Sequence, residues 1–260
     1  MRRNAALLWL VTSLFSGCNA QPDVQLNRFE YQLGNDNVVT VLHEVAGSDL
    51  LFFNMHDDEN TAVEAGLQVI ALRGGRLLEL QHTGNRLVSF GISSADYRFD
   101  PNRIFTPLGI EKTLERYSQA DSAAIEAVQA FANSLILDGG LKKAKLLVTL
   151  HNNGDNEYSA KSYLPGGEYD VDAESVYIQQ GRDPDDFLFV TQDQLFQLFK
   201  SAGLNVVLQN NSTVTDDGSL SVWAGREEIP YVNVEAQHGH LAEQVEMIIE
   251  VYRVVDNHFN

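Results

Sequence analysis

Three apolar runs in this chain each stop at a side chain that can bind a metal or move a proton. These are residues 50–55 before His56, residues 145–150 before His151, and residues 231–234 before Glu235. Short apolar runs of this kind are typical of buried strands. Helical patterns lie between them, which indicates an α/β fold with a mixed, mostly parallel sheet flanked by helices. Because ligands gather at the carboxyl ends of strands in such sheets, we expect His56, His151 and Glu235 to lie close together.

His56 and Glu59 form an H-x-x-E pair just before a predicted helix over residues 62–72. Imidazole and carboxylate are both ordinary zinc ligands, and a catalytic zinc typically has three protein ligands and a water. Alone, the pair is equally typical of a surface histidine beside an acid at a helix start. His151 taken singly could be a structural histidine, and Glu235 a salt-bridged acid. Their shared position at strand ends is what favours a metal site.

Periodicity and turn residues predict the remaining elements. We expect a strand over residues 38–43, a hairpin joining residues 76–81 and 86–92, a helix from Asp121 to residue 137, a helix over residues 191–202, a short strand over residues 219–223, and a helix over residues 241–254. The polar stretch from residue 152 to residue 186 is too long for an ordinary connection, which indicates a functional loop.

The first residues have the layout of a secretory signal. A basic start precedes an apolar run over residues 5–15, and small residues lead to Cys18, the only cysteine. The run is shorter than the ~20 residues of a membrane-spanning helix. Residues 14–18, Leu-Phe-Ser-Gly-Cys, resemble a bacterial lipobox. That resemblance implies a lipoprotein signal peptide over residues 1–17, a lipid on Cys18 and anchoring in the bacterial cell envelope. The alternative is an ordinary cleaved signal with a soluble product.

The usual sorting rule for lipoproteins, applied to Asn19, favours the outer membrane with the protein facing the periplasm. Residues 18–35 are expected to be a tether, and residues 36–260 one folded domain.

The chain carries 18 basic and 36 acidic residues, a net charge of −18. Such a surface repels phosphate backbones, so we expect no nucleic-acid partner, and we expect membrane contact to come from the lipid rather than from charge.

Several short motifs occur in a fixed order between about residue 50 and residue 248: His56-x-x-Glu59, the pair Asn102–Arg103, then His151 and Glu235. Together they resemble the zinc carboxypeptidase superfamily, including its branch with aspartoacylase and succinylglutamate desuccinylase. The separation of 151 − 56 = 95 residues is similar to that of the deacylase branch. The resemblance therefore covers nearly the whole expected domain, which it identifies as a catalytic domain.

The resemblance also implies a role for each matching residue. It implies one zinc ion held by His56, Glu59 and His151, with Glu235 as general base. It implies that Asn102 and Arg103 bind a substrate carboxylate and that Arg98 polarises the scissile carbonyl, with Arg86 as the alternative arginine. No residue can be assigned to the active-site tyrosine of digestive carboxypeptidases.

The activity expected from this resemblance is zinc-dependent cleavage of an amide bond next to a free carboxylate. The signal sequence favours peptides of the cell envelope, such as those derived from peptidoglycan, as substrates. One alternative is an N-acyl amino acid deacylase of the aspartoacylase or succinylglutamate desuccinylase type. Another is a non-catalytic, lipid-anchored binding protein on the same fold.

Overall fold

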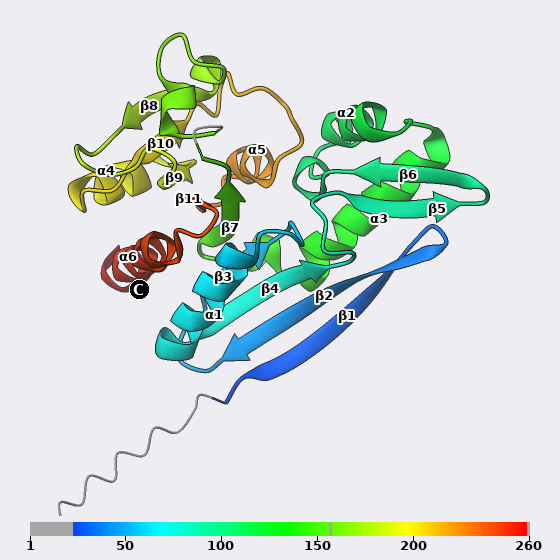
Figure 1. Cartoon of the computed structure of the whole chain (residues 1–260), viewed down its shortest axis with the longest axis horizontal. Helices are drawn as coiled ribbons and strands as arrows, with labels where there is room; N and C mark the ends of the chain where they lie inside the picture. Colours follow the sequence, from blue (N-terminus) through cyan, green and yellow to red (C-terminus); the bar gives the residue numbers. More distant parts are fainter. Residues whose placement is uncertain (1–22, 156–157, 259–260) are drawn as a thin grey trace, which may run out of the picture.

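A nine-stranded sheet forms the centre of the protein within the residues that the structure describes, 23–155 and 158–258 (Figure 1). The structure is a computed structural model. The sheet has the order β1-β2-β4-β3-β7-β11-β9-β10-β8. Its strands are β1 (Gln25–Leu33), β2 (Asp36–Val45), β3 (Leu51–Asn54), β4 (Gly75–Gln81), β7 (Leu147–Asn153), β8 (Ala173–Tyr177), β9 (Phe187–Val190), β10 (Val206–Gln209) and β11 (Tyr231–Gln237). Strands β5 (Val88–Ile92) and β6 (Ala95–Phe99) form a separate two-stranded sheet.

The middle of the large sheet is parallel. Strand β3 pairs in parallel with both β4 and β7, and β7 pairs in parallel with β11. Antiparallel pairs join β1 to β2, β2 to β4, β11 to β9, and β10 to β8. The predicted fold class, a single α/β domain with a mixed sheet flanked by helices, is confirmed. The parallel centre matters for function because it brings the carboxyl ends of β3, β7 and β11 to one edge.

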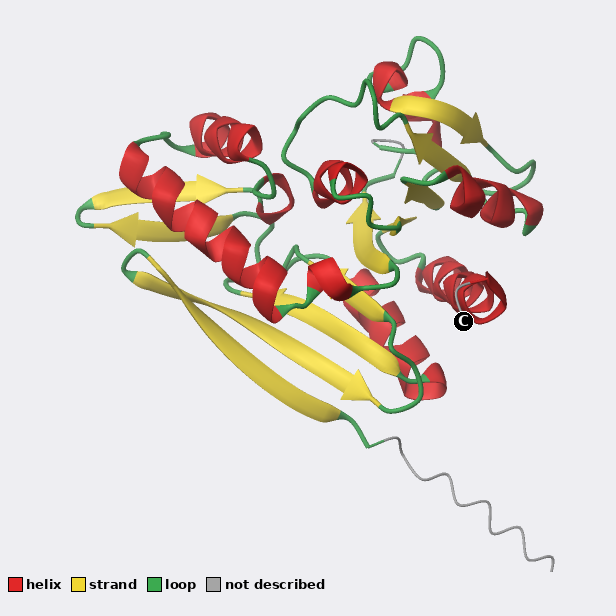
Figure 2. Cartoon of the chain, turned by 180° about the vertical axis from the view of Figure 1, so that it is seen from behind, coloured by secondary structure: helices red, strands yellow, loops and turns green. Residues whose placement is uncertain are grey.

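Helices cover both faces of the sheet (Figures 1 and 2). They are α1 (Asn60–Arg73), α2 (Pro107–Tyr117), α3 (Ser122–Asp138), α4 (Asp193–Ser201), α5 (Leu220–Arg226) and α6 (Leu241–His258). Helices α1, α4 and α6 pack on one face, and α2, α3 and α5 pack with the small sheet on the other. None of the helices in the described part of the chain combines the length and apolarity that crossing a membrane requires.

Strand β3 shows why two cores form. Leu51 and Phe53 point into the core beneath α3, whereas Phe52 points into the core beneath α1. Successive side chains of a strand face opposite sides, so an uninterrupted apolar run can fill both cores at once. All three side chains are fully or almost fully buried. The strand that leads to His56 is therefore fixed from both faces.

The expected tether over residues 18–35 is wrong from residue 25 onward. Residues Gln25–Leu33 form β1, which pairs with β2 along its whole length. A tight turn at Gly34 joins the two strands with φ at 61°, where an added Cβ would lie 2.2 Å from the carbonyl oxygen of Gly91. The alternation of Phe29, Tyr31 and Leu33 on the inner side is the signal for this strand.

Two smaller expectations also fail. The segments 76–81 and 86–92 do not form a hairpin, because β4 belongs to the large sheet and β5 pairs with β6. Residues 220–223 belong to helix α5 instead of a strand, with Ser219 as its N-cap, because Leu220, Trp223 and Ala224 follow a helical spacing that packs into the core. The predicted signal peptide over residues 1–17 and the lipidation site Cys18 lie outside the described residues.

Candidate metal centre and active site

His56, Glu59 and His151 come together at the carboxyl edge of the parallel centre. His56 follows the end of β3, and a backbone hydrogen bond from the Glu59 N–H to the His56 carbonyl, at 3.2 Å, folds the chain into a turn there. Glu59 occupies the N-cap position of α1 but makes no side-chain capping bond. Its carboxylate instead points at the histidines. His151 lies within β7, where the ladder pairs it with Glu235 of β11.

The three side chains present their ligand atoms to one point. The Nδ1 atoms of His56 and His151 lie 3.2 Å apart, and Glu59 Oε1 lies 2.8 Å from the Nδ1 of His56. Glu59 Oε2 lies 2.9 Å from the Nδ1 of His151. All of these atoms fall within 4.8 Å of one another, and all three residues are buried. Two imidazole nitrogens and a carboxylate at this spacing form a donor set that suits zinc.

Asp100 binds the opposite edge of the His56 ring. Its Oδ1 lies 2.8 Å from the Nε2 of His56 and also accepts the backbone N–H of Asn102 at 2.8 Å. The Asp100 carboxylate therefore also caps the Pro101–Arg103 turn that follows it. A hydrogen bond from Nε2–H to this carboxylate leaves the Nδ1 lone pair facing the other ligands, as in metal-bound histidines. Sequence reasoning assigned Asp100 no role.

The electrostatics of this cluster favour a bound cation. Burial alone would lower the pKa of His56, but the carboxylates of Glu59 and Asp100 raise it to about 9. Burial would raise the pKa of Glu59, yet the two histidines hold that pKa well below its usual range. The carboxylates that hold a proton on His56 would attract a divalent cation in the same way, and a bound metal would take the place of that proton. The buried donor set thus fits a divalent metal.

Glu235 is buried beside this cluster. Burial, together with the negative charge of Glu59, raises the pKa of its carboxyl group to about 8. Its Oε2 accepts a hydrogen bond from the side-chain amide of Asn233 at 2.9 Å. A carboxyl group whose pKa lies near neutrality can both take up and release a proton under physiological conditions. Strand β11 runs on to Gln237, so Glu235 lies inside the strand rather than at its end, directly opposite His151.

The arginine at the site is Arg86, and Arg98 lies elsewhere. The Nη1 of Arg86 donates to Glu59 Oε1 at 2.8 Å, and its Nε lies 3.7 Å from Asp100 Oδ2. Arg98 is exposed on β6, because its neighbours Tyr97 and Phe99 take the inward positions of that strand. The structure does not bring Arg98 to His56, Glu59 and His151. Arg86, the alternative arginine, is the one that contacts Glu59 and Asp100.

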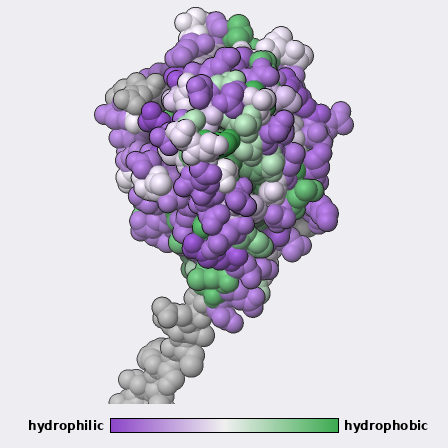
Figure 3. Space-filling view, turned by 90° about the vertical axis from the view of Figure 1, so that its right-hand side faces the viewer, coloured by the Kyte–Doolittle hydropathy of each residue, from purple (hydrophilic) through white to green (hydrophobic). Residues whose placement is uncertain are grey.

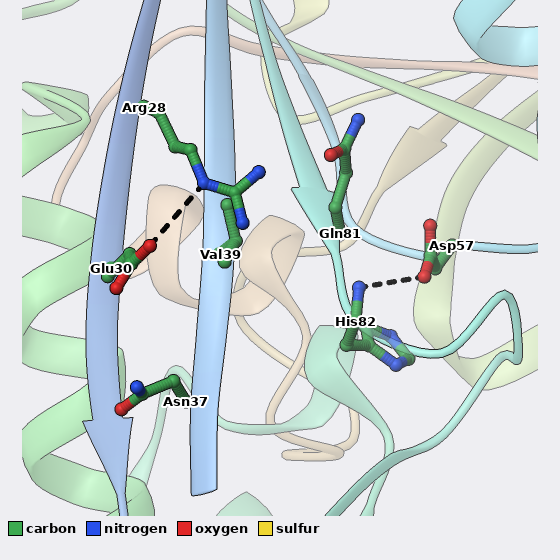
Figure 4. Close-up of a pocket in the computed structure, with 7 residues that line it drawn as sticks. All are labelled: Arg28, Glu30, Asn37, Val39, Asp57, Gln81 and His82. Atoms are coloured by element: carbon green, nitrogen blue, oxygen red, sulfur yellow. Dashed lines mark hydrogen bonds and ion pairs between the residues drawn. The ribbon is translucent and has the colours of Figure 1, made fainter.

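Asp57 fixes the loop that delivers Arg86. Its Oδ2 accepts the backbone N–H groups of His82 at 2.7 Å and of Gly84 at 2.6 Å, just before Arg86 in the chain. Figure 4 shows Asp57 and His82 together at one end of a cavity of about 510 Å³ that extends over β1, β2 and β4. The Asp57 carboxylate thus binds the backbone of this loop.

Asn102 and Arg103 lie on the other side of His151. The Nδ2 of Asn102 lies 3.5 Å from the Nε2 of His151, and its Oδ1 accepts the backbone N–H of Leu220 at 3.1 Å. Arg103 donates from Nη1 to the Asn102 carbonyl at 2.8 Å, and its Nε lies 3.4 Å from Asp217 Oδ2. The predicted substrate-binding pair is therefore close to His151, and Arg103 already faces an acid.

Tyrosines of the polar stretch 152–186 complete the surroundings of Arg103. The hydroxyl groups of Tyr158 and Tyr163 hydrogen-bond to each other, and both rings pack on Phe187. Burial raises the pKa of both hydroxyls, and the charge of Glu235 raises it further while Arg103 opposes it. These tyrosines thus sit within electrostatic range of both Glu235 and Arg103. The unusual length of the stretch was the only sequence signal for them.

Comparisons with known proteins give only remote likenesses. No protein-family model matches the chain, and no curated protein does. A solved structure of an aspartoacylase family protein from Mesorhizobium loti aligns with 91% of this chain and 67% of its own, at 13% identity and a TM-score of 0.43. A cold-adapted esterase from an Arctic intertidal metagenomic library, solved with bound polyethylene glycol, aligns with 53% of this chain and 62% of its own, at 15% identity and a TM-score of 0.25. Neither likeness assigns a family.

Proposed function

We propose that this protein is a zinc-dependent hydrolase of the zinc carboxypeptidase type, which cleaves an amide bond next to a free carboxylate. The observation that carries the proposal is the convergence of His56, Glu59 and His151, with ligand atoms within 4.8 Å, beside a buried Glu235. The ligands arise from a helix start and two strand ends that lie far apart in the sequence. Their order along the chain also supports this type of enzyme.

The three ligands would hold one zinc ion, and Asp100 would orient the His56 ring. Zinc bound there would supply a Lewis acid that polarises the carbonyl of the scissile bond and activates a water molecule. The second carboxylate at the site, Glu235, is not among the ligand atoms that converge. It is therefore left for proton transfer: it takes the proton of the attacking water and returns it to the leaving nitrogen. A pKa of about 8 in the free protein suits the second of these steps.

Arg86 would stabilise the negative charge that develops on the carbonyl oxygen. It reaches the cluster from the solvent side, and its guanidinium remains partly exposed. A cation already held by Glu59 and Asp100 needs no large movement to face a substrate bound at the same ligands. This role replaces the one expected for Arg98.

Arg103 would bind the substrate carboxylate, with Asp217 as an internal competitor. Arg103 offers five N–H donors in a rigid fork, and the structure shows contacts for Nε and Nη1. A substrate carboxylate would therefore share the guanidinium with Asp217 or displace it. Tyr158 and Tyr163 close this side of the site and would contact the substrate beyond its carboxylate. The substrate class is peptides with a free C-terminus or N-acyl amino acids.

The location of the protein is part of the same proposal. The lipobox-like sequence at Cys18 supports lipid anchoring in the bacterial cell envelope, with an outer-membrane, periplasm-facing orientation. Envelope peptides are then the substrates that the enzyme would meet. The acidic net charge argues against nucleic acid as a partner.

The test combines metal analysis with a substrate panel. Purified protein is expected to contain about one zinc ion per chain, in keeping with the single-metal catalytic sites of this ligand type. It is expected to hydrolyse either C-terminally free peptides or N-acyl amino acids, and to lose this activity when zinc is removed and regain it when zinc returns. C-terminal amides of the active substrate serve as the matched control. A zinc-loaded protein that cleaves none of the panel would contradict the proposed hydrolase and leave a metal-dependent binding protein.

A further inference from the structure

Basic residues gather at the edge of the sheet opposite to the metal ligands. A cavity of about 800 Å³ opens there, between the end of β2, the end of α1 and the start of β7. Its charged lining consists of Arg73, Arg76, Lys143 and Lys145 against Glu44, Asp49 and Asp256. Four basic and three acidic residues give this lining a net charge of 4 − 3 = +1, whereas the net charge of the chain is −18. The lining of this cavity thus carries a small positive charge on an acidic protein, although Arg73 is already paired with Asp256 at 2.7 Å, and we call this edge the basal rim.

The chain enters the folded domain at the basal rim. The register of the sheet places Gln25 opposite Glu44, Glu44 opposite Arg76, and Arg76 opposite Leu51. Neighbouring strands lie about 4.8 Å apart, so the start of β1 is only about 10 Å from the backbone of Arg76. Figure 1 shows the same relationship, with the start of β1 beside the end of β2.

Exposed apolar side chains occur at the same end. Leu72 in the last turn of α1 is 76% exposed, and Leu137 in the last turn of α3 is 74% exposed. Both helices run towards this end, because β4 and β7 start there. Val24 and Leu26, at the start of β1, are exposed as well. Figure 3 shows a hydrophobic area directly above the point where the described part of the chain begins. Basic and apolar side chains together are what a lipid surface binds.

We propose that the basal rim is the membrane-facing surface of the protein and that it contacts anionic lipid headgroups. This inference rests on the proposed lipid anchor at Cys18. Six residues separate Cys18 from Gln25, and the seven steps between the two residues span at most about 25 Å. An anchor that short holds the domain within reach of the headgroups. The acidic remainder of the surface is repelled by anionic lipid, so the rim is the face that turns towards it.

The consequence for the proposed activity is an orientation. His56, His151 and Glu235 lie at the carboxyl ends of the central strands, whereas the rim lies at their amino ends. A membrane-bound rim therefore turns the metal ligands away from the bilayer. Substrates would then enter the site from the aqueous compartment and not from the membrane.

The first experiment labels lysines of the full chain, lipidated on Cys18, with a water-soluble amine-acylating reagent. The protein is placed on vesicles of phosphatidylcholine alone or on vesicles that also contain phosphatidylglycerol. Lys143 and Lys145 are expected to be protected on the anionic vesicles and to regain reactivity in high salt, which screens surface charge. Lys161, exposed in the Ala160–Tyr163 turn near Arg103, is the internal control and should react equally on both. Protection of Lys161 instead, or equal reactivity of all three lysines on both vesicles, would overturn the proposal.

The second experiment measures flotation of the chain with vesicles and does not depend on lipidation. In a Cys18→Ser background, K143E/K145E is expected to reduce binding to anionic vesicles by about tenfold or more, because each basic residue near such a surface contributes to binding. K161E is the matched control and should bind like its parent. Equal binding of the two variants would contradict the rim as the contact surface. Mass analysis of Cys18 in the wild type separately decides whether the anchor exists, and neither readout depends on hydrolase activity.

Discussion

Asp100 Oδ1 lies 2.8 Å from the Nε2 of His56, on the far side of the imidazole from the Nδ1 that faces Glu59 and His151. This contact fixes both the tautomer and the rotation of a ring whose other nitrogen we propose as a metal ligand. It also connects two parts of the sequence that come together only in the folded protein. The candidate metal centre thus includes the Asp100 carboxylate, which contacts a proposed ligand and is not one itself.

The first prediction concerns this contact. Asp100→Asn preserves the size of the side chain and removes its charge, so it is expected to lower zinc affinity by about 10–100-fold. Competition with a chelator of known affinity measures the change. Asp96→Asn, at an exposed position on β6, is the control and should bind zinc as the wild type does. Unchanged affinity in Asp100→Asn would mean that Asp100 does not tune the His56 ligand.

The second prediction concerns the ligand set. His151→Ala is expected to lose stoichiometric zinc, because it leaves one imidazole and one carboxylate. Zinc at a hundred times its dissociation constant should stabilise the wild type by about 2.7 kcal/mol, and the variant by much less. Thermal unfolding with and without added zinc measures this. His238→Ala, an exposed histidine, should respond like the wild type. A variant that retains the full zinc response would refute the assignment of His151.

The third prediction concerns Glu235→Gln, which keeps volume and removes the titrating group. Turnover is expected to fall by about 10²–10⁴-fold while zinc is retained. The folding stability of the metal-free Glu235→Gln variant, by contrast, should exceed that of the wild type. In the metal-free protein, burial and the charge of Glu59 raise the pKa of Glu235 from its ordinary value of 4.5 to about 8. Between these pH values the folded state holds a proton that the unfolded state has released, so wild-type stability falls as pH rises.

Glu235→Gln lacks this titration and should gain stability over the wild type above about pH 5, by an amount on the order of a few kcal/mol at pH 8. Urea unfolding of both metal-free proteins at several pH values measures the difference. At low pH, where Glu235 is protonated in both states, the two proteins should converge. A constant difference at all pH values would show that the pKa of Glu235 is not raised.

The fourth prediction separates the two arginines. Arg86→Ala is expected to lower kcat by about 10²–10³-fold, as for a lost oxyanion donor, with zinc still bound. Arg98→Ala should leave kcat and KM near their wild-type values, because that side chain is exposed on β6. Steady-state kinetics on one substrate decides between them. Loss of turnover in Arg98→Ala alone would restore the role expected from the sequence.

The fifth prediction uses the Arg103–Asp217 pair. Arg103→Ala is expected to raise KM more than it lowers kcat, because a carboxylate clamp binds substrate and transition state alike. Asp217→Asn should have the reverse effect on KM, because it frees the guanidinium from its internal competitor. Blocking the substrate carboxylate as an amide should abolish the gain. An Asp217→Asn variant with raised KM would mean that the pair acts as a unit in substrate binding.

The meeting of His56, His151 and Glu235 was predictable because apolar runs of strand length indicate where buried strands lie. His56, His151 and Glu235 each follow such a run, and parallel pairing of β3, β7 and β11 places those ends side by side. Sheet geometry alone therefore takes strand-end residues to one edge. The chemistry of histidine and glutamate then restricts what the edge can bind.

Other residues of the site were missed for physical reasons. Arg98 seemed near the Asn102–Arg103 pair in sequence, but the alternation of Tyr97 and Phe99 turns it to the opposite side of the strand. Asp217 approaches Arg103 only through long-range folding, which no local pattern encodes. Strand β1 was missed because its polar, exposed outer face resembles a linker, although its inner face alternates.

The proposed metal ligands Glu59 and His151 are separated by 151 − 59 = 92 residues of chain, and this has a consequence for biosynthesis. His56 and Glu59 alone form a two-point site, and the third ligand arrives only when β7 has paired with β3. A nascent or unfolded chain therefore cannot close the site, and tight metal capture would mark the completion of folding. In an exported protein, the ion would then be drawn from the compartment in which the chain folds, not from the one in which it is made.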